Sequence, residues 1–110
     1  MAETSRMADT KATATSSAGA AATATITAAT GMSTYITSVA GGYDTAATAG
    51  TLTIKDGTTA IFVMPLTVQG AIHIEFEAPL KITRGANCSV VVSAGGGSVL
   101  AYANLSGYQI

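Results

Sequence analysis

The stretch that most constrains the fold is TLTIKDGTTAIFVMPL, residues 51–66, because it predicts two strands joined by a tight turn. Apolar and polar residues alternate from 51 to 55, which is the period of a strand with one buried face. Asp56 and Gly57 form the Asp-Gly pair that favours a two-residue type I′ hairpin turn. Residues 60–64 are apolar at every position, so we expect this second strand to be covered on both faces.

Further strands are predicted on both sides of this hairpin. Residues 71–77 alternate most regularly, with Ile72, Ile74 and Phe76 on the predicted core side and His73, Glu75 and Glu77 on the other. Other strand-like runs cover residues 23–28, 33–39, 88–93 and 99–104, and a Gly-rich loop is expected over 40–50. We therefore predict an all-β chain, an antiparallel β-sandwich or jelly roll of seven to eight short strands.

The N-terminal segment differs from the rest in composition. Residues 1–22 consist mainly of Ala, Thr and Ser, and their only large apolar side chains are two methionines. Such a segment buries too little surface to offset the entropy of ordering it. We expect an extended arm over 1–22, flexible or ordered only on assembly, and a β-sandwich domain over 23–110.

Low charge indicates assembly. Charged residues make up 10% of the chain and hydrophobic residues 48%, whereas about a quarter of an ordinary soluble domain is charged. No apolar run approaches the roughly 18 residues of a membrane-spanning helix, and the polar start lacks the apolar stretch of a secretory signal. We expect a protein made in the cytoplasm that hides part of its surface against neighbouring subunits.

Enzymatic and nucleic-acid functions find little support in the residue types present. The net charge is −1 and the five basic residues are scattered, which argues against phosphate binding. His73 is the single histidine and Cys88 the single cysteine, so we expect a surface histidine, a small buried thiol, no metal, no cofactor and no catalysis. Glu75 and Glu77 share a strand face that we expect to be solvated or part of an interface.

Tyrosine is the residue type that most suggests recognition. Four tyrosines, at 35, 43, 102 and 108, suit either subunit interfaces or a sugar-binding surface, and we favour interfaces. The candidate assembly contacts are Lys11, Tyr35, Tyr43, Glu75, Glu77 and Tyr102.

Several motifs taken together resemble a known protein class. They are Tyr-Ile-Thr at 35–37, the TLTIKDGTTAIF hairpin, Ala-Pro-Leu at 78–80 with Asn87 before a Val-rich strand, and YANLSGY at 102–108. Over residues 31–108 the chain is similar to small β-sandwich proteins of tailed bacteriophages, which serve as head decoration (cement) proteins or as modules of capsid and tail fibres. The resemblance implies a jelly-roll-like virion protein on the capsid exterior, commonly a homotrimer, whose N-terminal arm reaches neighbouring subunits.

We therefore expect a structural virion protein that binds the major capsid protein and stabilises the shell, with no nucleic-acid or membrane partner. Two alternatives remain open at this point. One is a fibre or receptor-binding module, and the other is a self-polymerising tail-tube or filament subunit.

Overall fold

The computed structural model describes residues 8–48, 50–66 and 69–110. These residues form eight strands, connected by loops and turns, and contain no helix. The strands are β1 (Ala8–Thr15), β2 (Ala22–Ile26), β3 (Thr34–Tyr43), β4 (Thr51–Asp56), β5 (Thr59–Pro65), β6 (Gly70–Lys81), β7 (Cys88–Val92) and β8 (Ala101–Gln109). The all-β prediction is confirmed.

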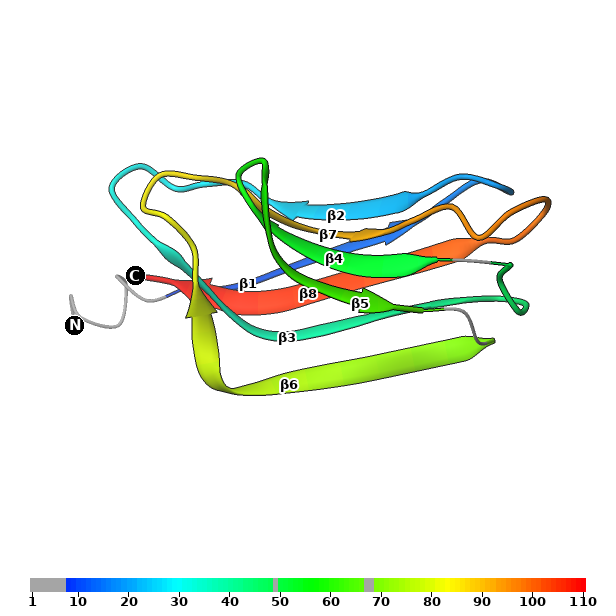
Figure 1. The fold of residues 1–110 in the computed structure, drawn as a ribbon. Coiled ribbons are helices and arrows are strands. Elements are labelled where there is room, and N and C mark those ends of the chain that lie inside the picture. The colour runs from blue at the N-terminus through cyan, green and yellow to red at the C-terminus, as the bar shows by residue number, and fades with distance from the viewer. Residues whose placement is uncertain (1–7, 49, 67–68) are drawn as a thin grey trace.

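The strands form two four-stranded sheets that wrap as a jelly roll (Figure 1). Sheet A has the order β1-β8-β3-β6 and sheet B the order β2-β7-β4-β5, and every neighbouring pair is antiparallel. The β4–β5 hairpin lies in sheet B, β3 pairs with β6 in sheet A, β2 pairs with β7 in sheet B, and β1 pairs with β8 in sheet A. The chain is thus one long hairpin, centred on residues 51–66, that is wound around the core.

The sandwich begins earlier than the boundary expected at residue 23. Residues 8–15 are strand β1, which pairs with β8 along its whole length, from Ala8 opposite Gln109 to Thr15 opposite Tyr102. Ala12 and Ala14 pack against the core, so small side chains supply the inward face of this strand. The first seven residues of the expected arm lie outside the described residues.

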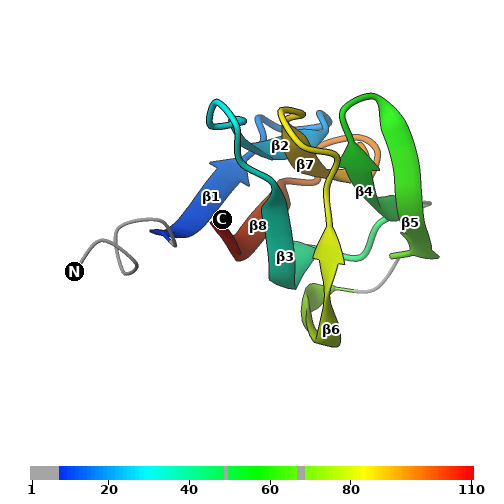
Figure 2. The ribbon, with the colours of Figure 1, turned by 90° about the vertical axis from the view of Figure 1, so that its left-hand side faces the viewer.

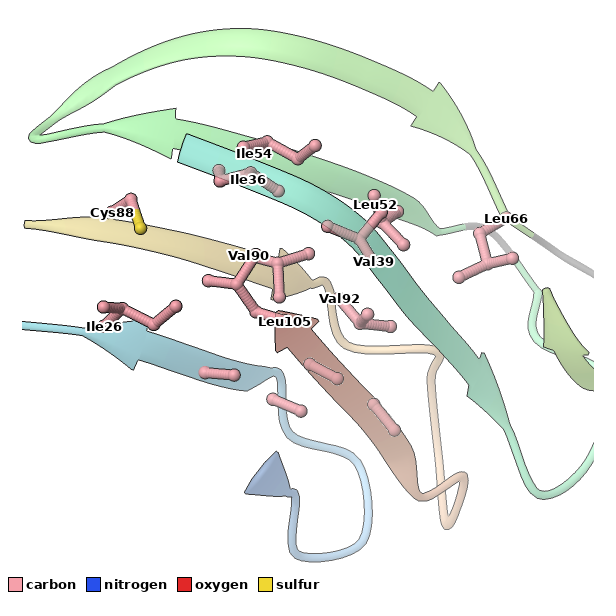
Figure 3. Packing of buried hydrophobic residues seen from close by; sticks show 14 of the residues in the cluster. Ile26, Ile36, Val39, Leu52, Ile54, Leu66, Cys88, Val90, Val92 and Leu105 are labelled. Atoms are coloured by element: carbon pink, nitrogen blue, oxygen red, sulfur yellow. The ribbon is translucent and has the colours of Figure 1, made fainter. Parts of the chain in front are cut away.

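The core lies between the sheets and consists mainly of aliphatic side chains, most of them from the central strands (Figure 3). Ile36, Val39 and Leu105 come from sheet A, while Leu52, Ile54, Val90 and Val92 come from sheet B, and each is at most 1% exposed. Burying such a side chain contributes about 1.5–3 kcal/mol. The alternation over residues 51–55 therefore identified the buried side of β4, because Leu52 and Ile54 both point into the core.

The two sheets diverge toward the edge strands β5 and β6 (Figure 2). Inward side chains there are only half-buried, and Phe62 of β5 meets Phe76 of β6 edge to face, with ring centroids 5.8 Å apart. The expectation that residues 60–64 are covered on both faces is wrong. Strand β5 pairs with β4 alone, so its other edge and its outer face remain exposed.

The hairpin turn is also shifted by one residue from the prediction. Asp56 pairs with Thr59, which leaves Gly57 and Thr58 as the two central residues. Gly57 has a positive φ of 63°, whereas Thr58 has a negative φ, because among the described residues only glycines have positive φ. A positive φ followed by a negative φ at the two central residues is typical of a type II′ turn. Asp56 instead accepts hydrogen bonds from the backbone N–H (3.1 Å) and the hydroxyl (2.8 Å) of Thr83. This carboxylate ties the hairpin to the loop before β7.

Candidate functional site

The exposed apolar residues of the molecule concentrate on edge strand β5. Ile61 and Val63 are 42% and 58% exposed, and Ala60 and Pro65 are exposed beside them. We call these four residues the β5 patch. Strand β5 contains no charged residue, although edge strands are commonly protected from association by charges.

The rest of the outer face of sheet B continues this surface with uncharged side chains. The register places Val63 beside Thr53, Thr53 beside Val91, and Val91 beside Thr23 in one row across the sheet. Among the described strand residues of this face, Lys55 is the one charged side chain that points outward. A partner docking on the β5 patch and the β4 residues beside it desolvates methyl and hydroxyl groups and few charges, which keeps the cost of binding low.

Sheet A carries a more polar outer face. Its register places Lys11 beside Ser106 and Ser106 beside Ser38, while Ser38 lies beside Glu75. A second row runs from Thr13 through Asn104 and Ala40 to His73, and a third from Thr15 through Tyr102 and Gly42 to Ala71. Most of the predicted contact residues therefore lie on this face and not on the β5 patch.

Two shallow depressions adjoin on this face. One, of about 240 Å³, is lined by Tyr102, Asn104 and the segments 41–43 and 70–71. The other, of about 270 Å³, is lined by residues 11–13 and 104–106. Because Asn104 lines both, we treat them together as the Tyr102 groove. Sequence reasoning singled out Tyr102 and Lys11 but missed Asn104, since only the register of β8 between β1 and β3 shows its position.

The four tyrosines have three different environments. Tyr102 is 38% exposed. Tyr35 and Tyr108 are half-buried and stack on each other, with ring centroids 5.2 Å apart and planes 13° apart. Tyr43 is 2% exposed, and its hydroxyl donates a hydrogen bond to the carbonyl oxygen of Ser93 at 2.9 Å. The proposed assembly contact is therefore wrong for Tyr43, which belongs to the core.

Glu75 lies beside an irregularity of β6, and Glu77 lies within it. Glu75 lies opposite Ser38 and Leu80 opposite Ile36, so residues 76–79 form a bulge opposite Thr37 alone. Strand β6 therefore extends beyond the alternating run of residues 71–77, continues past Pro79 to Lys81 and bends at this bulge (Figure 1). Both carboxylates are exposed and line one open depression with Thr37 and Phe76.

The residues considered for catalysis are separated by the fold. His73 is exposed on β6 of sheet A, whereas Cys88 is fully buried on β7 of sheet B. Burial raises the pKa of the Cys88 thiol to about 11, so the thiolate is disfavoured at neutral pH. Within residues 8–48, 50–66 and 69–110, no three His, Cys, Asp or Glu side chains gather as metal ligands would. The same residues include no helix able to cross a membrane.

Comparison with known proteins gives similarity of fold alone. No family model and no curated protein matches the sequence. Among solved structures, the chain is similar to a carbohydrate-binding module, CBM36 in complex with calcium and xylotriose, with 16% identity over 90% of this chain and 98% of that one and a TM-score of 0.49. The CBM36-1 domain of a xylanase from the hindgut metagenome of Trinervitermes trinervoides gives 10% identity over 92% and 94%, with a TM-score of 0.46. A Bacillus endospore appendage protein that forms disulfide-linked pili gives 14% identity over 93% and 87%, with a TM-score of 0.45.

Proposed function

We propose that this chain is a structural virion protein of the head decoration type, which docks on the capsid exterior through the β5 patch. The observation that carries the proposal is an uncharged edge strand whose Ile61 and Val63 are 42% and 58% exposed. The resemblance of the motifs at 35–37, 51–62, 78–80 and 102–108 to those of phage β-sandwich proteins favours the capsid as the partner. A charged fraction of only 10% supports a protein that works inside an assembly.

The mechanism is mechanical. Burying the β5 patch against a neighbour contributes about 25 cal/mol for each Å² of apolar surface removed from water. One small patch gives a weak contact, but copies that also contact one another add their free energies across a lattice. Binding to the assembled shell then favours that shell by mass action over its separated or expanded forms.

A charge placed on the patch tests the proposal. Val63→Lys puts a cation at the centre of the patch, where docking would have to desolvate it. Thr23→Lys is the matched control, because Thr23 is an exposed residue in the same row on the opposite edge strand. We expect Val63→Lys to abolish binding to particles that lack the protein, whereas Thr23→Lys binds like the native chain. Equal binding of both variants would refute docking through the β5 patch.

The mass of the purified protein and its copy number separate this function from its alternatives. A discrete oligomer, of which the homotrimer is our expectation, present in hundreds of copies per particle, supports decoration. A few copies per particle support a fibre or receptor-binding module. Protein that polymerises alone in light scattering supports a tube or filament subunit.

A further inference from the structure

We infer that the Tyr102 groove on the outer face of sheet A binds a neutral polysaccharide. The groove is independent of the proposed docking surface, because the β5 patch belongs to sheet B. The β5 patch and the groove are therefore tested by different variants, and either proposal can fail without the other.

The first support is an aromatic ring left accessible beside a depression. In the row that contains Tyr102, the neighbours across β3 and β6 are Gly42 and Ala71, which have little or no side chain. The ring of Tyr102 consequently lines the depression and keeps 38% of its surface exposed. The other tyrosines of the chain are less accessible, since Tyr35 and Tyr108 stack together and Tyr43 is buried.

The second support is the set of hydrogen-bonding groups around that ring. Asn104 is exposed and lines both depressions, and its amide offers donors and an acceptor. Thr13 and Thr15 are exposed on the neighbouring strand, with Thr13 directly beside Asn104 and Thr15 directly beside Tyr102. These groups are neutral, and Lys11 at the far end is the one charged side chain that lines the groove.

This combination fits a sugar better than other ligands. A pyranose ring presents a C–H face that packs on an aromatic ring and a rim of hydroxyls that exchange hydrogen bonds with amide and hydroxyl groups. Two adjoining depressions that share Asn104 suit successive residues of one sugar chain. A lipid would require a deeper apolar cavity, and an anionic polymer would require several cations where the groove has Lys11 alone.

The experiment is affinity gel electrophoresis of the full chain in gels that contain soluble xylan, galactan, glucomannan or mixed-linkage β-glucan. We expect at least one of these polymers to retard the native protein. Tyr102→Ala should raise the dissociation constant about fivefold to tenfold, because an aromatic stacking contact is lost, and Asn104→Ala should also weaken retardation. Tyr108→Ala is the matched control, because it removes a tyrosine from the same strand and face outside the groove.

Thermal unfolding of each variant separates loss of binding from loss of the fold. If Tyr102→Ala does not fold, the binding site is located on the native chain by NMR. Addition of the retarding polysaccharide should then change the chemical shifts of Thr13, Tyr102 and Asn104. The proposal is overturned if none of the four polymers retards the native chain, or if Tyr102→Ala and Tyr108→Ala lose retardation equally. Retardation by dextran sulfate alone would equally overturn it, because the groove would then act through charge.

Discussion

Replacing Tyr43 with phenylalanine removes one partly buried hydrogen bond from the end of the sandwich. The Tyr43 hydroxyl donates to the carbonyl oxygen of Ser93 at 2.9 Å, and the ring packs so closely that a Cβ on Gly95 would lie 2.9 Å from it. The phenylalanine keeps the packing and leaves that carbonyl without this donor. We therefore expect the free energy of unfolding to fall by about 1 kcal/mol, which lowers Tm by about 4 °C for a domain of this size.

Chemical and thermal unfolding followed by circular dichroism measure this loss. Tyr102→Phe is the control, because Tyr102 lies on the outer face and its replacement should leave the stability unchanged. Particle binding of Tyr43→Phe should equal that of the native chain at temperatures where both are folded. A variant that is as stable as the native chain but binds particles less would refute the core role and restore Tyr43 as an assembly contact.

Two further predictions concern Asp56 and Cys88. Asp56→Ala removes the acceptor of both Thr83 hydrogen bonds and should lower the free energy of unfolding, measured in urea, by about 1–2 kcal/mol. Asp56→Asn should lose less stability. An unchanged urea midpoint for Asp56→Ala would show that these hydrogen bonds do not stabilise the fold. Burial raises the pKa of the Cys88 thiol to about 11, so the folded chain keeps this proton at pH values where the unfolded chain loses it. The stability of the native chain should therefore fall more than that of Cys88→Ala as pH rises from about 9 to about 11, and parallel pH profiles would show that the thiol does not contribute.

Local patterns predicted most strands and the buried side of several of them, because alternation reports which face meets a core. They failed where the inward residues are small. Strand β1 was taken as part of an arm since Ala12 and Ala14 give no apolar signal, although β8 provides a full pairing partner. Strand β5 was taken as covered because a run of apolar residues looks the same in the sequence whether its outer face is covered or exposed.

The candidate surfaces could not be predicted from local patterns, because they are formed by residues that are distant in the sequence. Tyr43 and Tyr102 are the same residue type in similar Gly- and Ala-rich surroundings, yet one faces the core and the other faces outward. The expected loop over 40–50 hid this difference, because β3 runs on to Tyr43 through Gly41 and Gly42. Gly42 allows the backbone of Gly70 to approach closely, and no local pattern predicts such a contact.

The nested winding of the chain has a consequence for its synthesis on the ribosome. Strand β8 lies between β1 and β3 in sheet A, although it follows every other strand in the sequence. Sheet A therefore cannot close until residues 101–109 have left the exit tunnel, whereas the β4–β5 hairpin can form as soon as residue 65 emerges. Pairing of β1 with β8 joins residues about ninety positions apart, which slows folding. The nascent chain thus displays its apolar hairpin before its core is sealed, and a chaperone that shields residues 59–65 during translation should raise the yield of folded protein.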